Sequence, residues 1–128
     1  MSRICILLAT YQGERFLRQQ LDSLVAQTHS DWACVAQDDC STDATFDILQ
    51  EYAQASSKFV VMRVSNRLGG AKQNFFSLIA YAQEHMLDAE YFAFCDQDDI
   101  WLPEKLASSL QALQQLEGAL DGAPAAIC

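Results

Sequence analysis

The sequence contains no apolar run that approaches the roughly 20 residues a helix needs to cross a bilayer. Near the N-terminus a short apolar run lies between a single arginine and the polar stretch YQGER, which is not the order of a secretory signal peptide. We therefore expect a reducing, cytoplasmic location, which includes the inner face of the membrane.

Basic side chains are also scarce. Eight Lys and Arg residues stand against 17 Asp and Glu residues, which gives a formal net charge of −9. Such a chain repels a phosphate backbone, and this argues against binding to nucleic acid. An acidic protein can still bind a phosphorylated small molecule when a metal ion supplies the positive charge.

The five cysteines form no CxxC pair, and their number is odd. Cys5, Cys34 and Cys95 stand within apolar runs, so we expect small buried side chains in place of a disulfide framework or a zinc site. The two histidines lack the spacing of metal ligands, and no Ser-His-Asp or Cys-His arrangement indicates nucleophilic catalysis.

Apolar strand-like runs alternate with amphipathic helical segments along the chain. We expect strands at residues 3–9, 31–37, 58–64 and 90–95, and the closing APAAIC, which ends at Cys128, looks like the start of a fifth. Strands separated by helices form right-handed crossovers. Residues 1–128 are therefore expected to form one α/β domain, with a doubly wound, mostly parallel sheet and helices on both faces.

The spacing of apolar residues also predicts which helical side chains face the core. In the helix that starts at Glu14 these include Leu17, Leu21, Leu24 and Val25, and in the third helix Phe75, Phe76, Ile79 and Ala80. Ser41, Thr42 and Asp43 are candidates for the N-cap of the second helix.

Polar residues follow every one of the four strands. They are Thr10, Tyr11 and Gln12 after the first, Asp38 and Asp39 after the second, Asn66 and Arg67 after the third, and Asp96, Asp98 and Asp99 after the fourth. The carboxyl ends of parallel strands share one edge of the sheet, which is where such folds bind ligands. We therefore expect these groups to lie around one site.

Several of these residue types suit a nucleotide. Asp39 could accept a hydrogen bond from the N–H of a uracil or thymine ring. Lys72 stands near the first turn of a helix, where a cation is disfavoured unless an anionic phosphate lies close by; a solvated surface lysine is the alternative. Mg²⁺ or Mn²⁺ would relieve the repulsion among the carboxylates after the fourth strand. The alternative is that Asp98 or Asp99 merely leads into the next helix.

Four motifs in this order, ILLATYQGE, QDDCSTDAT, NRLGGAKQN and FCDQDDIWLPEKL, resemble the nucleotide-sugar-binding half of inverting glycosyltransferase family 2, which has the GT-A fold. The resemblance covers almost the whole chain. DQDDIW looks most like the rhamnosyltransferases of this family, which would imply a dTDP-sugar such as dTDP-rhamnose; a UDP-sugar is the other donor it implies.

The resemblance implies a role for each matching residue. Thr10, Tyr11 and Asp39 would border the pyrimidine, Lys72 would lie beside the nucleotide or its phosphates, Asp96 would contact the ribose, and Asp98 would ligate Mg²⁺ or Mn²⁺ in the D-x-D motif.

The resemblance also implies a reaction and a missing part. The family transfers the sugar in a single displacement to a saccharide or lipid-linked acceptor. Its general base comes from a later segment, which in this sequence would lie beyond Cys128. The resemblance therefore implies a donor half truncated before the acceptor-binding half, and none of the present residues is expected to be the base.

Two other functions fit some of these features. A non-catalytic, regulatory module that binds nucleotide-sugars would keep Asp39 and Asp98 without needing a base. A receiver-like or phosphatase-like domain with Mg²⁺ is disfavoured, because NRLGGAKQN has no role there. For the truncated chain we also expect exposed apolar surface, and with it self-association.

Overall fold

Strands and helices alternate in the computed structural model, which describes residues 3–96 and 98–119. In chain order the elements are β1 Ile4–Thr10, α1 Glu14–Val25, β2 Trp32–Asp38, α2 Thr45–Ala55, β3 Phe59–Arg63, α3 Ala71–His85, β4 Tyr91–Asp96 and α4 Lys105–Ala119. The four expected strands and the helices between them are confirmed to within about two residues at most ends.

Two expectations concern the end of the chain. The fifth strand expected at APAAIC, up to and including Cys128, lies outside the described residues. The general base expected beyond Cys128 lies outside them as well, so the structure tests neither expectation.

The four strands form one sheet in the order β3-β2-β1-β4, and every neighbouring pair is parallel. Every residue of β1 and β2 is buried, as expected for apolar strands that are covered on both faces. The chain moves outward from β1 to β3 and then returns to place β4 on the other side of β1. This reversal puts the topological switch point between β1 and β4, the place where α/β sheets bind ligands.

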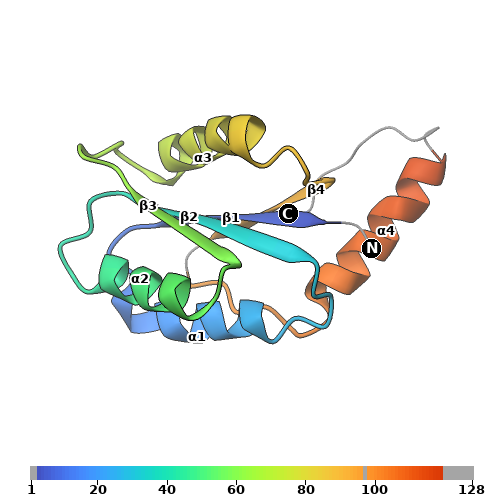
Figure 1. Cartoon of the computed structure of the whole chain (residues 1–128), viewed down its shortest axis with the longest axis horizontal. Coiled ribbons are helices and arrows are strands. Elements are labelled where there is room, and N and C mark those ends of the chain that lie inside the picture. The colour runs from blue at the N-terminus through green and yellow to red at the C-terminus, as the bar shows by residue number, and fades with distance from the viewer. Residues whose placement is uncertain (1–2, 97, 120–128) are drawn as a thin grey trace.

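Helices cover both faces of the sheet (Figure 1), so the doubly wound α/β prediction is confirmed. On one face, α1 and α2 pack against the sheet, and Leu106, Leu110 and Leu113 of α4 join the same apolar cluster. On the other face α3 contributes Leu78 and Ala82 to a second cluster. The two cores leave the carboxyl ends of the strands to be shaped by the connecting loops.

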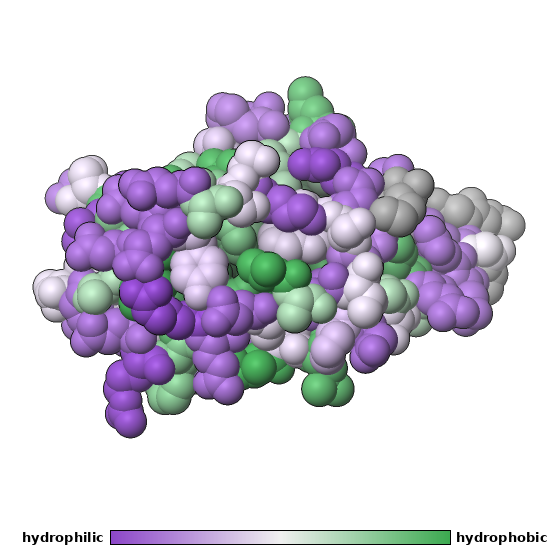
Figure 2. Space-filling model, turned by 60° about the horizontal axis from the view of Figure 1, so that its bottom comes forward, coloured by the Kyte–Doolittle hydropathy of each residue, from purple (hydrophilic) through white to green (hydrophobic). Residues whose placement is uncertain are grey.

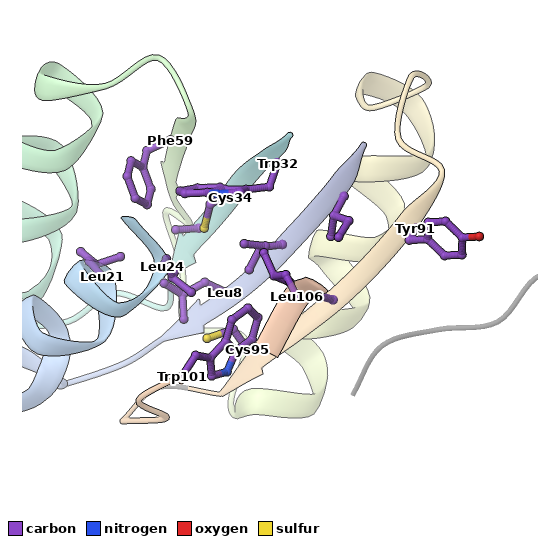
Figure 3. Close-up of a cluster of buried hydrophobic side chains, with 14 of the residues drawn as sticks. Leu8, Leu21, Leu24, Trp32, Cys34, Phe59, Tyr91, Cys95, Trp101 and Leu106 are labelled. Carbon is purple, nitrogen blue, oxygen red and sulfur yellow. The ribbon is translucent and has the colours of Figure 1, made fainter. Parts of the chain in front are cut away.

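The larger core cluster is anchored by aromatic rings at the β2–β3 side of the sheet (Figure 3). The rings of Trp32 and Phe59 meet edge to face with centroids 5.6 Å apart, a favoured arrangement for aromatic pairs. The thiols of Cys34 and Cys95 are buried in the same cluster. The expected burial of the strand cysteines is therefore confirmed.

The predicted inward faces of two helices are partly wrong. Val25 is 58% exposed at the end of α1, and Phe76 is 60% exposed on α3; Ala80 is exposed as well. In α3 the buried stripe runs through Asn74, Leu78 and Ala82. Because successive residues turn by about 100° around a helix, this stripe leaves Phe75 and Ile79 at its border and carries Phe76 and Ala80 beyond it.

The surface is mainly hydrophilic on the face shown in Figure 2, with hydrophobic residues in separate patches. Exposed large apolar side chains include Ile100 and Leu102 in the β4–α4 connection, together with Phe76 and Leu87. In the described part of the chain, no helix has the length and apolar character needed to span a membrane.

Candidate nucleotide site

A cavity of about 490 Å³ opens at the carboxyl edge of the sheet. Its lining comes from the ends of β1, β2 and β4 and from the β3–α3 loop with the start of α3: Ala9, Thr10, Tyr11, Asp39, Arg67, Gly70, Ala71, Asn74, Asp96 and Asp98. Of the residues predicted to share one site, six line this cavity: Thr10, Tyr11, Asp39, Arg67, Asp96 and Asp98. The others do not line it: Gln12, Asp38, Asn66, Lys72 and Asp99. That convergence is a consequence of the parallel strand order, because each contributing segment leaves the sheet at the same edge.

The floor of the site is built on the carboxylate of Asp38, which is completely buried. It accepts hydrogen bonds from Thr10 Oγ1 at 2.9 Å, from Ser41 N at 2.8 Å and from Ser41 Oγ at 2.6 Å. Hydrogen bonds to a charged acceptor are among the stronger ones in proteins. Asp38 therefore fixes the end of β1 against the β2–α2 loop and serves the site as support.

These contacts also correct the expected N-cap of α2. Ser41 is engaged by Asp38, and the helix begins at Thr45, preceded by Ala44 without a side-chain cap. Asp43 comes closest to the predicted role, since its Oδ1 accepts a hydrogen bond from Thr45 N at 3.0 Å. Slight burial acts to raise the pKa of Asp43, but hydrogen bonds such as this one lower it overall.

Asp39, the next residue, is held by the loop between β3 and α3. Its side chain is 2% exposed, and its carboxylate accepts hydrogen bonds from Leu68 N at 2.6 Å and from Gly69 N at 3.3 Å. Gly69 has a φ of +98°, which L side chains rarely adopt. A carboxylate has about four acceptor positions, so Asp39 retains capacity for a ligand N–H.

Arg67 and Tyr11 form the rim next to Asp39. The Arg67 guanidinium carbon lies 3.8 Å from the centre of the Tyr11 ring, and Arg67 Nε lies 3.5 Å from Asp39 Oδ2. The arginine thereby combines a cation–π contact with an ion pair.

Three amide side chains tie the segments around the site together. Gln12, with a φ of +52°, accepts a hydrogen bond from Thr42 N at 2.6 Å through its side-chain oxygen, while its own backbone N donates to Ser41 Oγ at 2.8 Å. Asn74 and Gln37 pair across α3 and β2, with Gln37 Nε2 donating to Asn74 Oδ1 at 2.9 Å. These bonds make the cavity wall a connected unit.

The carboxylates after β4 lie at the opposite side of the cavity from the β3–α3 loop. Asp96 ends β4, Asp98 has a φ of +71°, and Asp99 N donates to the Asp96 carbonyl at 3.2 Å. All three are exposed, and Asp96 and Asp98 both line the cavity. A left-handed non-glycine residue at such a position is uncommon and is enriched for aspartate.

The carboxylates present determine how a divalent cation would fit at this cavity. Across residues 3–96 and 98–119, no group of three or more His, Cys, Asp or Glu side chains could hold a metal ion by itself. Mg²⁺, however, usually takes one or two protein carboxylates and completes its shell with water and phosphate oxygens. A single exposed carboxylate that lines the cavity, such as that of Asp98, suits that mode as the protein ligand.

Lys72 lies in the first turn of α3, beside cavity-lining Ala71, but it does not line the cavity. Its amine lies over the Phe76 ring, 5.8 Å from the centroid. Trp101 is 6% exposed and belongs to the larger core cluster, so it packs in the core and does not line this cavity.

Sequence reasoning missed Asn74 and did not assign a role to Arg67, and it overlooked Gln20 entirely. Gln20 is buried on α1, and its Nε2 donates to the Asp96 carbonyl at 2.5 Å and to Cys95 Sγ at 3.2 Å. Burial raises the pKa of the Cys95 thiol to about 12, although the hydrogen bond from Gln20 lowers it. The signal for Gln20 was available, since this glutamine lies three residues after Leu17 and next to Leu21, on the inward stripe of the helix.

Comparison with known proteins identifies the family to which this fold and site belong. A family model described as glycosyl transferase family 2 matches residues 5–126. The dTDP-rhamnosyl transferase RfbG of Shigella flexneri is 35% identical over 107 residues, which are 83% of this chain and 36% of that protein. The chain therefore spans little more than a third of the length of this relative.

Solved structures of S. aureus TarS have the same fold. The crystal structure of TarS superimposes with a TM-score of 0.76 at 25% identity and covers 90% of this chain and 20% of TarS. The crystal structure of TarS 1–349 in complex with UDP gives a TM-score of 0.72 at 26% identity, over 90% of this chain and 32% of that one.

Proposed function

The chain belongs to glycosyl transferase family 2 and has its GT-A fold, and on that premise we propose that it binds the nucleotide-sugar donor of a glycosyltransferase. The observation that carries this proposal is the meeting of Tyr11, Asp39 and Asp98 around one cavity at the carboxyl edge of the sheet. An aromatic face, a buried acceptor and an exposed carboxylate suit a base, its N–H edge and a diphosphate with its cation.

The pyrimidine would bind on the side of the cavity formed by Tyr11 and Asp39. Uracil and thymine each present a ring N–H between two carbonyl groups, and Asp39 is an acceptor fixed in place by two backbone N–H groups. Thr10, anchored by Asp38, would close the floor below the base. Adenine presents no ring N–H at the corresponding edge, so Asp39 favours uracil and thymine over adenine.

The ribose and diphosphate would extend toward β4, with Asp96 on the ribose and Asp98 holding Mg²⁺ or Mn²⁺. When bound, such a cation stabilises the negative charge of the departing nucleoside diphosphate. Lys72 would reach a phosphate only by leaving its position over the Phe76 ring. Gly70 and Ala71 line the cavity at the start of α3, where backbone N–H groups favour an anion.

Two similar proteins, whose names or structures include different pyrimidine nucleotides, support a pyrimidine as the base of the donor. RfbG is named as a dTDP-rhamnosyl transferase, and the TarS structure contains UDP. Asp39 would accept the same N–H from either base, so the donor is a UDP- or dTDP-sugar, with dTDP-rhamnose as one candidate. In the complete protein we place the reaction in the cytoplasm, with saccharides and lipid-linked saccharides as the candidate acceptors.

The transfer itself would be a single displacement that inverts the anomeric carbon. An acceptor hydroxyl would attack that carbon while a carboxylate base removes its proton. In this scheme the present chain holds the donor's nucleotide, and the base belongs to the acceptor side of the complete protein, in a segment beyond Cys128.

Calorimetry on the 128-residue chain tests this function with UDP, dTDP, GDP and ADP, each with and without Mn²⁺. We expect UDP and dTDP to bind more tightly than ADP, and Mn²⁺ to tighten their binding by about tenfold. Asp98→Ala should abolish the Mn²⁺ effect. The matched control Asp47→Ala, at an exposed carboxylate on α2, should retain it.

Two results would contradict the proposal in different ways. UDP binding that ignores both Mn²⁺ and Asp98→Ala would defeat the metal assignment. Equal affinity for ADP and UDP would defeat the assignment of the base to Asp39.

A further inference from the structure

Arg67 occupies a position in the cavity that the proposed function does not use. Its guanidinium lies against the ring of Tyr11, with 3.8 Å between Cζ and the ring centre, and its Nε is 3.5 Å from Asp39 Oδ2. Arg67 itself lines the cavity. One flat cationic group therefore contacts both the aromatic ring and the buried carboxylate.

These are the two contacts that a pyrimidine base would make. A guanidinium is planar, stacks on aromatic faces and presents N–H donors along its edge, and a uracil ring shares these three properties at its N–H edge. The guanidinium contacts the Tyr11 ring and Asp39 Oδ2 at the same time. A base that stacks on this face of Tyr11 and also contacts Asp39 therefore needs the same space. Arg67 and the base are thus alternatives for one position.

We infer that Arg67 occupies the base-binding position when no donor is bound and is displaced when the donor binds. This inference rests on the proposed function, because it takes Tyr11 and Asp39 as the base contacts. It adds a competition within the site: the donor's base must exchange with a side chain of the protein before it reaches Asp39.

The contacts that hold Arg67 are weak enough for such an exchange. Its side chain is 45% exposed, and its Nε lies 3.5 Å from Asp39 Oδ2, which is longer than a normal N–H···O hydrogen bond. A cation–π contact of such an exposed side chain contributes little to stability. Asp39 is different, since the backbone N–H groups of Leu68 and Gly69 hold it in either state. The exchange therefore requires a side-chain rotation of Arg67 and leaves the acceptor in place.

A charged carboxylate that is almost fully buried also needs a donor in both states. Arg67 supplies part of that compensation in the empty site, and the ring N–H would supply it in the complex. A ligand without such a donor would leave Asp39 less well compensated than Arg67 does.

Uridine tests the inference because it carries the base without any phosphate. Calorimetry should show that Arg67→Ala binds uridine about five-fold more tightly than the wild-type chain, since the competing side chain is gone, which corresponds to about 1 kcal/mol. Arg67→Lys, which keeps the charge without the planar group, should lie between the two. The control Arg18→Ala makes the same change in net charge at an ion pair with Glu51 on the surface, and should leave the affinity unchanged.

The possible outcomes distinguish a failure of this inference from a failure of the proposed function. Weaker binding of uridine by Arg67→Ala would show that the arginine holds the base, and an unchanged affinity would show that it does not compete; either overturns the inference while the proposed function stands. Failure of the wild-type chain and Arg67→Ala alike to bind uridine would overturn both.

A measurement on the unmodified chain avoids any effect of substitution on folding. In the NMR spectrum the side-chain N–H signal of Arg67, identified by its loss in Arg67→Ala, should be shifted by the Tyr11 ring current. Saturating uridine should remove that shift. A signal that keeps its position at saturation would rule out displacement.

Discussion

At the scale of single residues, the adjacent carboxylates Asp38 and Asp39 have different tasks. Asp38 is buried within the protein and binds Thr10 and Ser41, whereas Asp39 is held by backbone N–H groups at the cavity. The sequence shows two adjacent aspartates at the end of a strand, and we predicted from it that Asp39 meets the base. Which of them supports the loops depends on where the side chains point, and the sequence pattern does not specify that direction.

Burial also sets the chemistry of the cysteines, and this leads to a pH prediction. Burial raises the pKa of the Cys5 and Cys95 thiols to about 12. At pH 8 a thiol of that pKa has a thiolate fraction of about 10⁻⁴, against about one quarter for an ordinary cysteine. We expect iodoacetamide to modify Cys5 and Cys95 roughly a thousandfold more slowly in the native protein than in the unfolded chain, at a native rate that rises about tenfold per pH unit.

Peptide mapping by mass spectrometry after timed quenching would measure these rates residue by residue. In concentrated urea the cysteines should react at similar rates, which controls for differences in intrinsic reactivity. Rapid labelling of Cys95 at pH 8 in the native protein would show that the core beneath Asp96 opens easily, contrary to the complete burial of this thiol.

At the scale of elements, the alternation of apolar and amphipathic segments was sufficient to predict β1–β4, the parallel sheet and helices on both faces. The prediction of which helix residues face the core was only partly correct. Val25 directly follows the buried Leu24, and Phe76 lies two residues from both Asn74 and Leu78. Both are apolar, so composition alone favours burying them. The actual stripe of α3 instead includes Asn74, whose amide pairs with Gln37. A polar side chain can be buried when another buried group satisfies its hydrogen bonds.

The loop between β3 and α3 provides a prediction about backbone strain. Gly69→Ala should lower the free energy of unfolding by about 1–2 kcal/mol, because Gly69 has a φ of +98° and left-handed backbone is costly for L residues. An added Cβ would meet no atom within 4 Å, so the loss comes from the backbone. Affinity for UDP should fall as well, since Gly69 N donates to Asp39. Urea unfolding and calorimetry would measure the two effects.

The same substitution in α4 is the matched control. Gly118 also has no atom within 4 Å of an added Cβ, but it lies in a helix, where alanine is favoured over glycine. Gly118→Ala should therefore raise stability, by about 0.5 kcal/mol near the helix end. Stability changes of the same sign in the two variants would contradict the claim that Gly69 is required for its conformation.

At the scale of the whole molecule, the position of the site follows from topology. Parallel strands bring the residues after each strand to one edge, so the sequence could predict a common location for Tyr11, Asp39 and Asp98 without any knowledge of distances. It could not predict the contact of Arg67 with Tyr11 and Asp39. That contact depends on how the loop after β3 turns, and loop conformation is specified by the φ of Gly69 and by hydrogen bonds between residues far apart in sequence.

Net charge leads to the last prediction. The chain has a formal charge of −9, and UDP is a multiply charged anion, so the two repel each other at long range. Salt screens such repulsion, with a Debye length that falls from about 30 Å at 0.01 M to about 8 Å at 0.15 M. Without divalent cations, we therefore expect UDP to bind about two- to threefold more tightly at the higher of these ionic strengths.

Uridine is uncharged and serves as the control, because its affinity should not change with salt. Calorimetry in KCl, with a chelator present, would measure both ligands. The sign of the UDP effect decides between two sources of positive charge. If UDP binds less tightly as salt rises, nearby cations such as Lys72 hold the diphosphate and Asp98 has little need of a metal; if it binds more tightly, the acidic site lacks the charge that a divalent cation would bring.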